Sequence, residues 1–242
     1  METRDITGTV IAITGATSGV GRAAAAALVE AGARVALTGR RSDRLANIEA
    51  QLGSDNVVYV VGDIQDPATS NSLVEAAVRR YGRLDSIVIS AGIGAYGGIL
   101  DGTDASLTEM LRTNIDGTIW AVRAAVPQLR AGHGGDIIVI ASVAGLRGGG
   151  NEAVYAATKF AQVGLAGAID RELCPDGIRV TALCPAAIST EFAIGSGRIE
   201  GDPWLDGVLT ADDVASAVLT VLRQPRRLRT TQWAMWSMVE AS

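Results

Sequence analysis

The chain has 242 residues, of which 48% are hydrophobic and 19% are charged, and its formal net charge is -5. A chain of this length and composition can bury roughly 70 to 75% of its unfolded surface, which excludes a disordered protein. The acidic balance and the low aromatic content of 4% also disfavour a nucleic-acid partner, because phosphates attract clustered basic residues and bases stack on aromatic side chains.

Short apolar runs alternate along the chain with longer segments of helical period. This alternation is typical of an α/β protein in which helices cover both faces of a parallel sheet. No repeat or linker divides the chain, so we predict one doubly wound domain over residues 1–242. The predicted strands, in chain order, are Val10 to Thr14, Arg34 to Leu37, Val57 to Val61, Ile87 to Ser90, Ile137 to Ala141, Val180 to Cys184 and a weaker one near Gln232 to Trp236.

Helix ends are marked by residues with known terminal preferences. Asp66 followed by Pro67 predicts the start of a helix, since Asp is a good N-cap and Pro is favoured at the first helical position. Gly32, Gly53 and Gly82 stand where helices should stop, because glycine readily adopts the left-handed conformation found after a helix.

A glycine-rich turn follows the first predicted strand. Gly15, Gly19 and Gly21 lie between this strand and a helix containing Arg22 to Leu28. Gly15 permits a sharp turn, Gly19 lets the backbone approach a phosphate, and Gly21 allows close helix packing, so that amides at the positive end of the helix dipole face an anion. The pattern predicts a pyrophosphate site; the alternative is a glycine-rich turn without a ligand.

With the threonine before it, this segment reads TGATSGVG from Thr14 to Gly21 and resembles the TGxxxGxG motif of the short-chain dehydrogenases/reductases. Later motifs extend the resemblance over most of the chain. It implies a Rossmann-type domain that binds NAD(P), with catalytic groups at the carboxyl ends of the strands. The cofactor contacts that it implies are Gly15, Thr17, Ser18, Gly19, Val20, Gly21, Asp63, Ile64, Ser90, Ala91, Gly92, Tyr155, Lys159, Pro185, Ile188 and Thr190.

The residues that follow the second strand indicate which nicotinamide cofactor is bound. An acidic residue there would bind the 2′-hydroxyl of NAD, but the chain has Gly39. Arg40 and Arg41 could bind the 2′-phosphate of NADP through charge-assisted hydrogen bonds. We therefore predict NADP(H), with Arg41 expected to be the more solvated of the two; the alternative is that both arginines belong to a solvated turn.

Tyr155 and Lys159 are suited to proton transfer. They are four residues apart in a helix predicted from Glu152 to Leu173 and so share one face. Hydride transfer to a carbonyl needs a proton donor at the oxygen, and a phenol beside an ammonium provides one. Bringing the pKa of Tyr155 from about 10 to about 7 requires roughly 4 kcal/mol, which a partly buried Lys159 and an oxidised nicotinamide ring could supply.

The resemblance implies a role for each member of the proton-transfer set. Tyr155 corresponds to the acid/base, and Lys159 to the residue that lowers its pKa and holds the nicotinamide ribose. Ser142, at the end of the fifth strand, corresponds to the group that polarises the carbonyl oxygen. Asn114 corresponds to the asparagine that completes a water-mediated proton relay.

Two segments depart from the family pattern. Ser90 stands where the family often has asparagine, and its shorter side chain puts a cofactor contact in doubt. Ala186 replaces the usual glycine after Pro185, which puts the turn geometry in question because alanine resists positive φ.

A long segment rich in glycine, residues 186–209, is predicted to be a substrate lid. It contributes Phe192 and Trp204 to a predicted substrate wall that also includes Ile93 to Gly97 and Val143 to Gly150. This wall is mostly small and apolar, which favours a small ketone or aldehyde.

Three functions remain open at this point. The first is an NADP-dependent carbonyl reductase or alcohol dehydrogenase, which interconverts such a carbonyl and a secondary alcohol. The second is a non-catalytic protein of the same fold that senses NADPH. The third, a dehydratase or epimerase with bound NAD, is disfavoured by the loop spacing, the chain length and Arg40. The family resemblance also implies a homodimer or homotetramer.

Metal and membrane functions are disfavoured by composition. His133, Cys174 and Cys184 cannot form a Cys/His zinc site without several carboxylates. The longest apolar runs are shorter than the roughly 20 residues needed to span a bilayer, and the first residues lack the pattern of an export signal. We therefore expect a cytoplasmic protein with no metal and no membrane partner.

Overall fold

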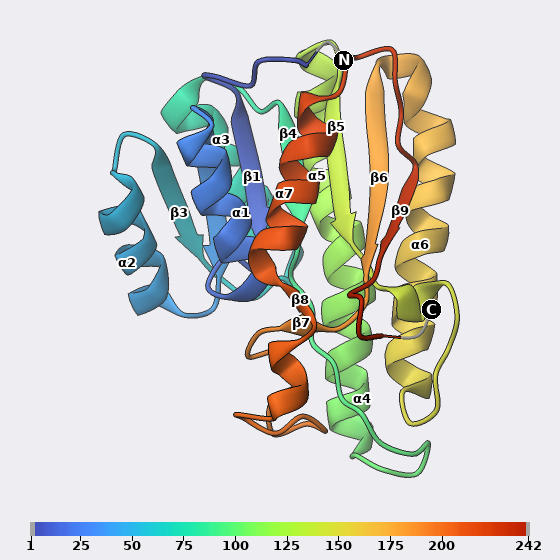
Figure 1. Ribbon diagram of the computed structural model, residues 1–242. Helices are drawn as coiled ribbons and strands as arrows, with labels where there is room; N and C mark the ends of the chain where they lie inside the picture. The colour runs from blue at the N-terminus through green and yellow to red at the C-terminus, as the bar shows by residue number, and fades with distance from the viewer. Residues whose placement is uncertain (1–2, 241–242) are drawn as a thin grey trace.

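The computed structural model describes residues 3–240. Its centre is a seven-stranded sheet with helices on both faces (Figure 1). The strand order is β3-β2-β1-β4-β5-β6-β9, and every neighbouring pair is parallel. The strands are β1 (Val10–Thr14), β2 (Arg34–Gly39), β3 (Val57–Val61), β4 (Ser86–Ile89), β5 (Gly135–Ile140), β6 (Ile178–Pro185) and β9 (Gln232–Met235).

Two sets of helices cover the two faces of this sheet. Leu28, Leu45 and Val218 pack on one face from the first set, while Leu73 and Ala125 pack on the other from the second. Alternate strand residues point to opposite faces, so each face has its own hydrophobic core. The first set is α1 (Gly19–Glu30), α2 (Ser42–Leu52) and α7 (Ala211–Arg223), and the second includes α3 (Pro67–Tyr81), α5 (Gly117–Ala131) and α6 (Ala153–Leu173).

The predicted α/β class, parallel sheet and two-sided covering are confirmed. β4 begins and ends one residue earlier than predicted, so Ser90 lies just beyond the strand. β2 and β6 extend as far as Gly39 and Pro185. The strand order reverses direction between β1 and β4, and in such sheets ligands bind at this point, beyond the carboxyl ends of the strands.

Local signals located several of the helix ends. The Asp66 side chain accepts a hydrogen bond from the Ala68 amide at 2.9 Å, and Pro67 is the first residue of α3. Gly53 and Gly82 follow α2 and α3 with φ of +90° and +79°. α1 ends at Glu30 with Ala31 as its C-cap, and Gly32 follows with φ of +85°.

The segment 186–209 has more regular structure than its glycine content suggested. β7 (Ile188–Ser189) pairs in parallel with β8 (Leu209–Thr210), and Pro203–Asp206 forms a short 3-10 helix. Figure 1 shows this segment and α4 (Asp104–Leu111) beside the carboxyl ends of the strands. Ala186 is not among the described residues with positive φ, so alanine fits the turn that follows β6.

Candidate active site

A cavity of about 1250 Å³ lies at the carboxyl ends of the strands. The structure brings nearly all of the predicted site residues to its walls. Gly21 and Asn114 are the two predicted residues that do not line it. Those that do are Gly15, Thr17, Ser18, Gly19, Val20, Arg40, Arg41, Asp63, Ile64, Ser90, Ala91, Gly92, Ser142, Tyr155, Lys159, Pro185, Ile188 and Thr190.

The glycine loop leaves no room for side chains at its closest approaches. A Cβ at Gly15 would lie 2.6 Å from the Cα of Ala91, and Gly15 has a φ of +67°. A Cβ at Gly21 would lie 2.5 Å from the carbonyl oxygen of Gly15. The Thr14 hydroxyl accepts hydrogen bonds from the amides of Ser90 and Ala91, at 3.2 and 3.1 Å. The loop is therefore packed closely against the segment after β4 and the start of α1, and its amides lie at the N-terminus of that helix, as in a dinucleotide site.

Arg41 is the arginine that lies against the glycine loop. Its guanidinium donates to the hydroxyls of Thr17 and Ser18 at 2.9 and 2.8 Å. Its side chain is 39% exposed, against 58% for Arg40. The prediction that Arg41 is the more solvated residue was therefore wrong, because loop hydroxyls 23 and 24 residues away in sequence fix its position.

Arg40 lies farther out and pairs with acidic residues. Its Nη1 is 3.3 Å from Glu109 and 3.9 Å from Asp63. Before it, Gly39 packs so tightly that a Cβ would lie 2.5 Å from Cγ2 of Thr17. A side chain at position 39 would therefore require the Thr17 side chain to move.

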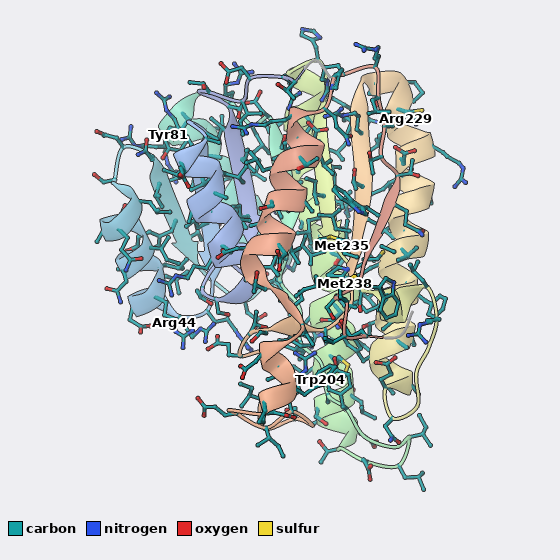
Figure 2. The ribbon with its side chains drawn as sticks, in the orientation of Figure 1. Arg44, Tyr81, Trp204, Arg229, Met235 and Met238 are labelled. Atoms are coloured by element: carbon teal, nitrogen blue, oxygen red, sulfur yellow. The ribbon has the colours of Figure 1, made fainter. Side chains whose placement is uncertain are left out.

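Glu191, from the segment after β7, closes over the same edge of the cavity. Its carboxylate pairs with Arg41 at 2.7 Å and with Arg44 at 2.9 Å. Burial raises the pKa of Glu191, but hydrogen bonds from Ser18, Arg41 and Arg44 outweigh it and lower that pKa to about 2. Figure 2 shows Arg44 and Trp204 on the side of the molecule where the strands end, and Arg229 and Tyr81 on the opposite side. A carboxylate thus occupies the position at which two arginines could meet an anionic ligand.

Tyr155 lines the same cavity, together with Tyr96 and Phe192. It is buried between the rings of Tyr96 and Phe192, each 5.8 Å away between centroids. Burial raises the pKa of Tyr155, with a further rise from Tyr96, and these effects exceed the lowering by Ser142 and Arg198. The sequence predicts that the pKa of Tyr155 falls toward about 7. The protein's own groups do not lower it, because the phenol is buried among aromatic rings. The protein favours the neutral phenol, which is a proton donor.

Lys159 is buried one turn farther along α6. Its Nζ donates to the carbonyl of Ile140 at 3.1 Å and to Oε1 of Gln162 at 2.8 Å, and it lies 5.6 Å from the centre of the Tyr155 ring. Burial lowers the pKa of Lys159 to about 8, while Cys184 raises it. At pH 7 the side chain is therefore still mostly an ammonium.

Ser142 and Asn114 approach this pair from other elements. The Ser142 hydroxyl donates to the carbonyl of Pro185 at 3.3 Å and accepts from the Ala144 amide at 3.1 Å. Asn114 is fully buried in a π-helical turn (Arg112–Asp116) that joins α4 to α5; such turns are frequent at functional sites. Its side chain bonds both backbone groups of Ile93, at 2.9 and 2.8 Å, and donates to the Thr158 hydroxyl at 2.9 Å.

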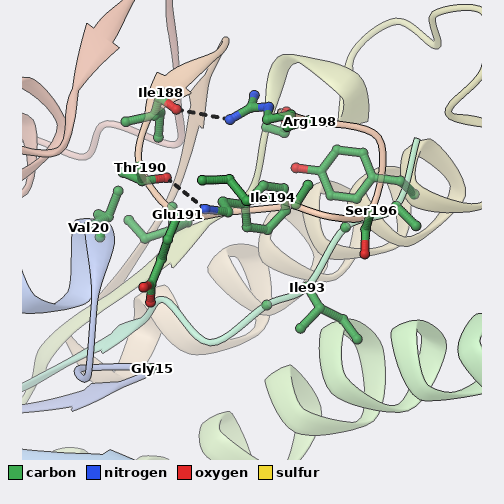
Figure 3. A pocket seen from close by; sticks show the side chains of 18 of the residues that line it. Gly15, Val20, Ile93, Ile188, Thr190, Glu191, Ile194, Ser196 and Arg198 are labelled. Atoms are coloured by element: carbon green, nitrogen blue, oxygen red, sulfur yellow. Dashed lines mark hydrogen bonds between the residues drawn. The ribbon is translucent and has the colours of Figure 1, made fainter. Parts of the chain in front are cut away.

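Several residues of the cavity escaped the sequence analysis. Arg198 donates to the carbonyl of Ile188 at 3.0 Å (Figure 3). Its guanidinium also lies 5.5 Å from the centre of the Tyr96 ring. Trp236 also lines the cavity, and the centre of its ring lies 4.7 Å from the guanidinium of Arg147. No local pattern marks either residue, since both reach the cavity from loops.

Two classes of site are missing from the part of the chain that the structure describes. Residues 3–240 contain no group of three or more His, Cys, Asp or Glu side chains that could hold a metal ion. His133 is exposed in a turn, with φ of +61°. None of the described helices has the length and hydropathy needed to cross a bilayer.

Comparison with known proteins places the chain among similar oxidoreductases. The sequence pattern of the short chain dehydrogenase family matches residues 9–198. An uncharacterized oxidoreductase of Staphylococcus aureus (strain N315) is 32% identical over 230 residues, which cover 94% of this chain and 96% of the relative. A second one, from Staphylococcus haemolyticus (strain JCSC1435), is 29% identical with the same coverage.

Solved structures agree over nearly the whole chain. The alcohol dehydrogenase of the archaeon Thermococcus sibiricus, complexed with 5-hydroxy-NADP, is 29% identical with a TM-score of 0.88, covering 97% of this chain and 98% of that one. The closed form of a serine dehydrogenase complexed with NADP+ is 26% identical with a TM-score of 0.89 and covers 97% of each chain. The 3-ketoacyl-(acyl-carrier-protein) reductase of Brucella melitensis, complexed with NADH, is 28% identical with a TM-score of 0.86, covering 95% and 96%.

Proposed function

The chain belongs to the short-chain dehydrogenase family and is an NAD(P)-dependent oxidoreductase, and from this premise we propose that it transfers a hydride between NADP(H) and a small, mostly apolar ketone or aldehyde, or the corresponding secondary alcohol. The observation that carries the proposal is the position of Tyr155: a buried phenol, beside Ser142, in the cavity that begins at the glycine loop.

The protein's own groups support the chemistry at the carbonyl. The nicotinamide cofactor, when bound, supplies or accepts the hydride. Tyr155 then gives a proton to the substrate oxygen, and its raised pKa keeps that proton on the phenol until the oxygen becomes basic. The Ser142 hydroxyl lies where it can hold the same oxygen, and the aromatic wall of Tyr96 and Phe192 excludes water from it.

The walls of the cavity support NADP(H) as the cofactor. Arg41 and Arg44 lie at the glycine loop, and Gly39 stands where an acidic side chain would select NAD. Guanidinium groups suit the dianionic 2′-phosphate of NADP because they bind phosphate oxygens through charge-assisted hydrogen bonds. Two of the similar structures contain NADP forms and one contains NADH. The proposal of NADP(H) over NAD(H) therefore rests on Arg41, Arg44 and Gly39.

The function is tested with a panel of small ketones and aldehydes, with NADPH and NADH each followed by absorbance. We expect consumption of NADPH with at least one apolar member of the panel, and at least tenfold lower kcat/KM with NADH. Comparable rates with both cofactors would contradict the arginine assignment. The NADPH-sensor alternative would be favoured by two results together: no NADPH consumption with any ketone or aldehyde, and a protein partner that binds differently to the NADPH-bound and cofactor-free forms.

A pair of substitutions at the glycine loop tests the cofactor assignment separately. Arg41→Leu should weaken NADPH binding by roughly 10- to 100-fold, the equivalent of one lost charged hydrogen bond, and NADH binding far less. Glu191→Gln should tighten NADPH binding several-fold, because it removes a carboxylate that competes for Arg41 and Arg44. Dissociation constants from cofactor fluorescence check both. Equal losses for NADPH and NADH in Arg41→Leu would show that Arg41 only supports the loop.

A further inference from the structure

A buried glutamine holds the lysine of the proton-transfer set. Gln162 lies three residues after Lys159 on α6, is 1% exposed and does not line the cavity. Its Oε1 accepts a hydrogen bond from the ammonium at 2.8 Å. With the Ile140 carbonyl, this accounts for two of the three protons that an ammonium can donate. The third is left for a group in the cavity.

The amide nitrogen of Gln162 is anchored on the π-helical turn. Nε2 donates to the main-chain carbonyl of Asn114 at 2.9 Å and to the hydroxyl of Thr118 at 2.8 Å. The Thr118 hydroxyl in turn donates to the same carbonyl at 2.7 Å. A carbonyl oxygen has two lone pairs and an amide nitrogen has two N–H donors, so Gln162 and Thr118 use both lone pairs of the Asn114 carbonyl, and both N–H donors of Gln162 are used.

We propose that Gln162 is a positioning residue that orients the Lys159 ammonium beside Tyr155. Its amide also lies between Lys159 and the Asn114 carbonyl and so keeps water from bridging them. The proposal rests on the proposed function only in that Lys159 acts in catalysis. The water-mediated relay expected through Asn114 would need the place that Gln162 holds. Protons then reach Lys159 and Tyr155 from the cavity and not through the Asn114 carbonyl.

The surroundings of Lys159 make this hydrogen bond important for its charge. The titratable groups near it are Tyr155 on α6 and Cys184 on β6. Among residues 3–240, no carboxylate forms an ion pair with it. A buried ammonium without a counterion depends on neutral acceptors, and Gln162 is the one acceptor that comes from a side chain.

The test follows Lys159 directly, because it is the only lysine of the chain. Protein labelled with ¹³C and ¹⁵N lysine gives one side-chain signal, which is titrated by NMR without added cofactor. Gln162→Met keeps the volume and removes the acceptor, so the titration midpoint should fall by one pH unit or more. Gln162→Glu keeps an acceptor and adds a negative charge, so the midpoint should rise. Gln128→Met, the same change on α5, should leave the midpoint in place.

The two shifts of opposite sign distinguish positioning from support of the fold. Midpoints within 0.3 pH unit of the parent in both Gln162 variants would overturn the proposal. Should Gln162→Met fail to fold, the sign of the shift in Gln162→Glu decides. In Gln162→Ala, which opens room for water, the Nζ protons should exchange with solvent at least tenfold faster. Exchange at the parent rate would contradict the exclusion of water.

A kinetic readout separates this proposal from the proposed function. In alcohol oxidation, the fall of kcat/KM at high pH should move in the same direction as the NMR midpoint in each variant. If the midpoints move as expected but the parent oxidises and reduces nothing, the function is wrong and the role of Gln162 toward Lys159 stands. If the parent is active and neither the midpoint nor the pH profile moves, Gln162 has no positioning role.

Discussion

Replacing Tyr155 with phenylalanine is expected to lower kcat for carbonyl reduction by at least two decades while NADPH still binds. The substitution removes one oxygen atom from a buried ring and leaves the contacts with Tyr96 and Phe192 in place. General acid catalysis typically contributes about 10² to 10⁴-fold. The loss should therefore appear in kcat, because the proton is needed in the transition state and not for binding.

The control for this prediction is Tyr59→Phe, the same change on β3 away from the cavity, which should keep full activity. Single-turnover reduction with excess protein measures the chemical step, and quenching of cofactor fluorescence measures NADPH binding. Unchanged reduction by Tyr155→Phe would show that another group protonates the substrate. A loss of NADPH affinity equal to the loss of rate would instead show that the phenol serves the cofactor.

The second large effect is expected at the far end of the sheet, where three arginines share the carboxylate of Asp136. Asp136 is 1% exposed at the start of β5. Its oxygens lie 2.6 Å from Arg179, 3.1 Å from Arg226 and 3.2 Å from Arg4. Arg179 is itself buried and also donates to the carbonyl of Leu228 at 2.9 Å. This one carboxylate joins β5, β6, the N-terminal segment and the loop after α7.

Asp136→Ala should lower the free energy of unfolding by about 3 to 5 kcal/mol, because it leaves the Arg179 charge buried and unpaired. Urea unfolding followed by circular dichroism measures the change. Asp176→Ala, which removes an exposed partner 2.7 Å from Arg130, should cost less than about 1 kcal/mol. Equal effects at the two positions would show that Asp136 is no more than a surface ion pair in energetic terms.

Most of the fold could be predicted because its signals are local. Strand β1 is a run of five apolar or β-branched residues, and the turn after it needs glycine at set positions, so neighbouring residues determine both. Tyr155 and Lys159 share a helix face because of their spacing alone. The cavity that brings Ser142 and these two residues to the glycine loop follows from the parallel sheet, in which all strand ends meet at one edge.

Tertiary structure decided which charged and polar groups meet. Glu191 reaches Arg44 across 147 residues, and Arg41 rather than Arg40 contacts the loop hydroxyls. The Lys159 ammonium donates to the carbonyl of Ile140 on β5, in addition to its local contact with Gln162 on α6. The contacts between distant segments depend on the path of the loops and on how the helices pack on the sheet, and burial sets the pKa values of Tyr155 and Lys159. The chain's local pattern thus specified the scaffold and the reacting groups, while packing between distant segments set their charges and partners.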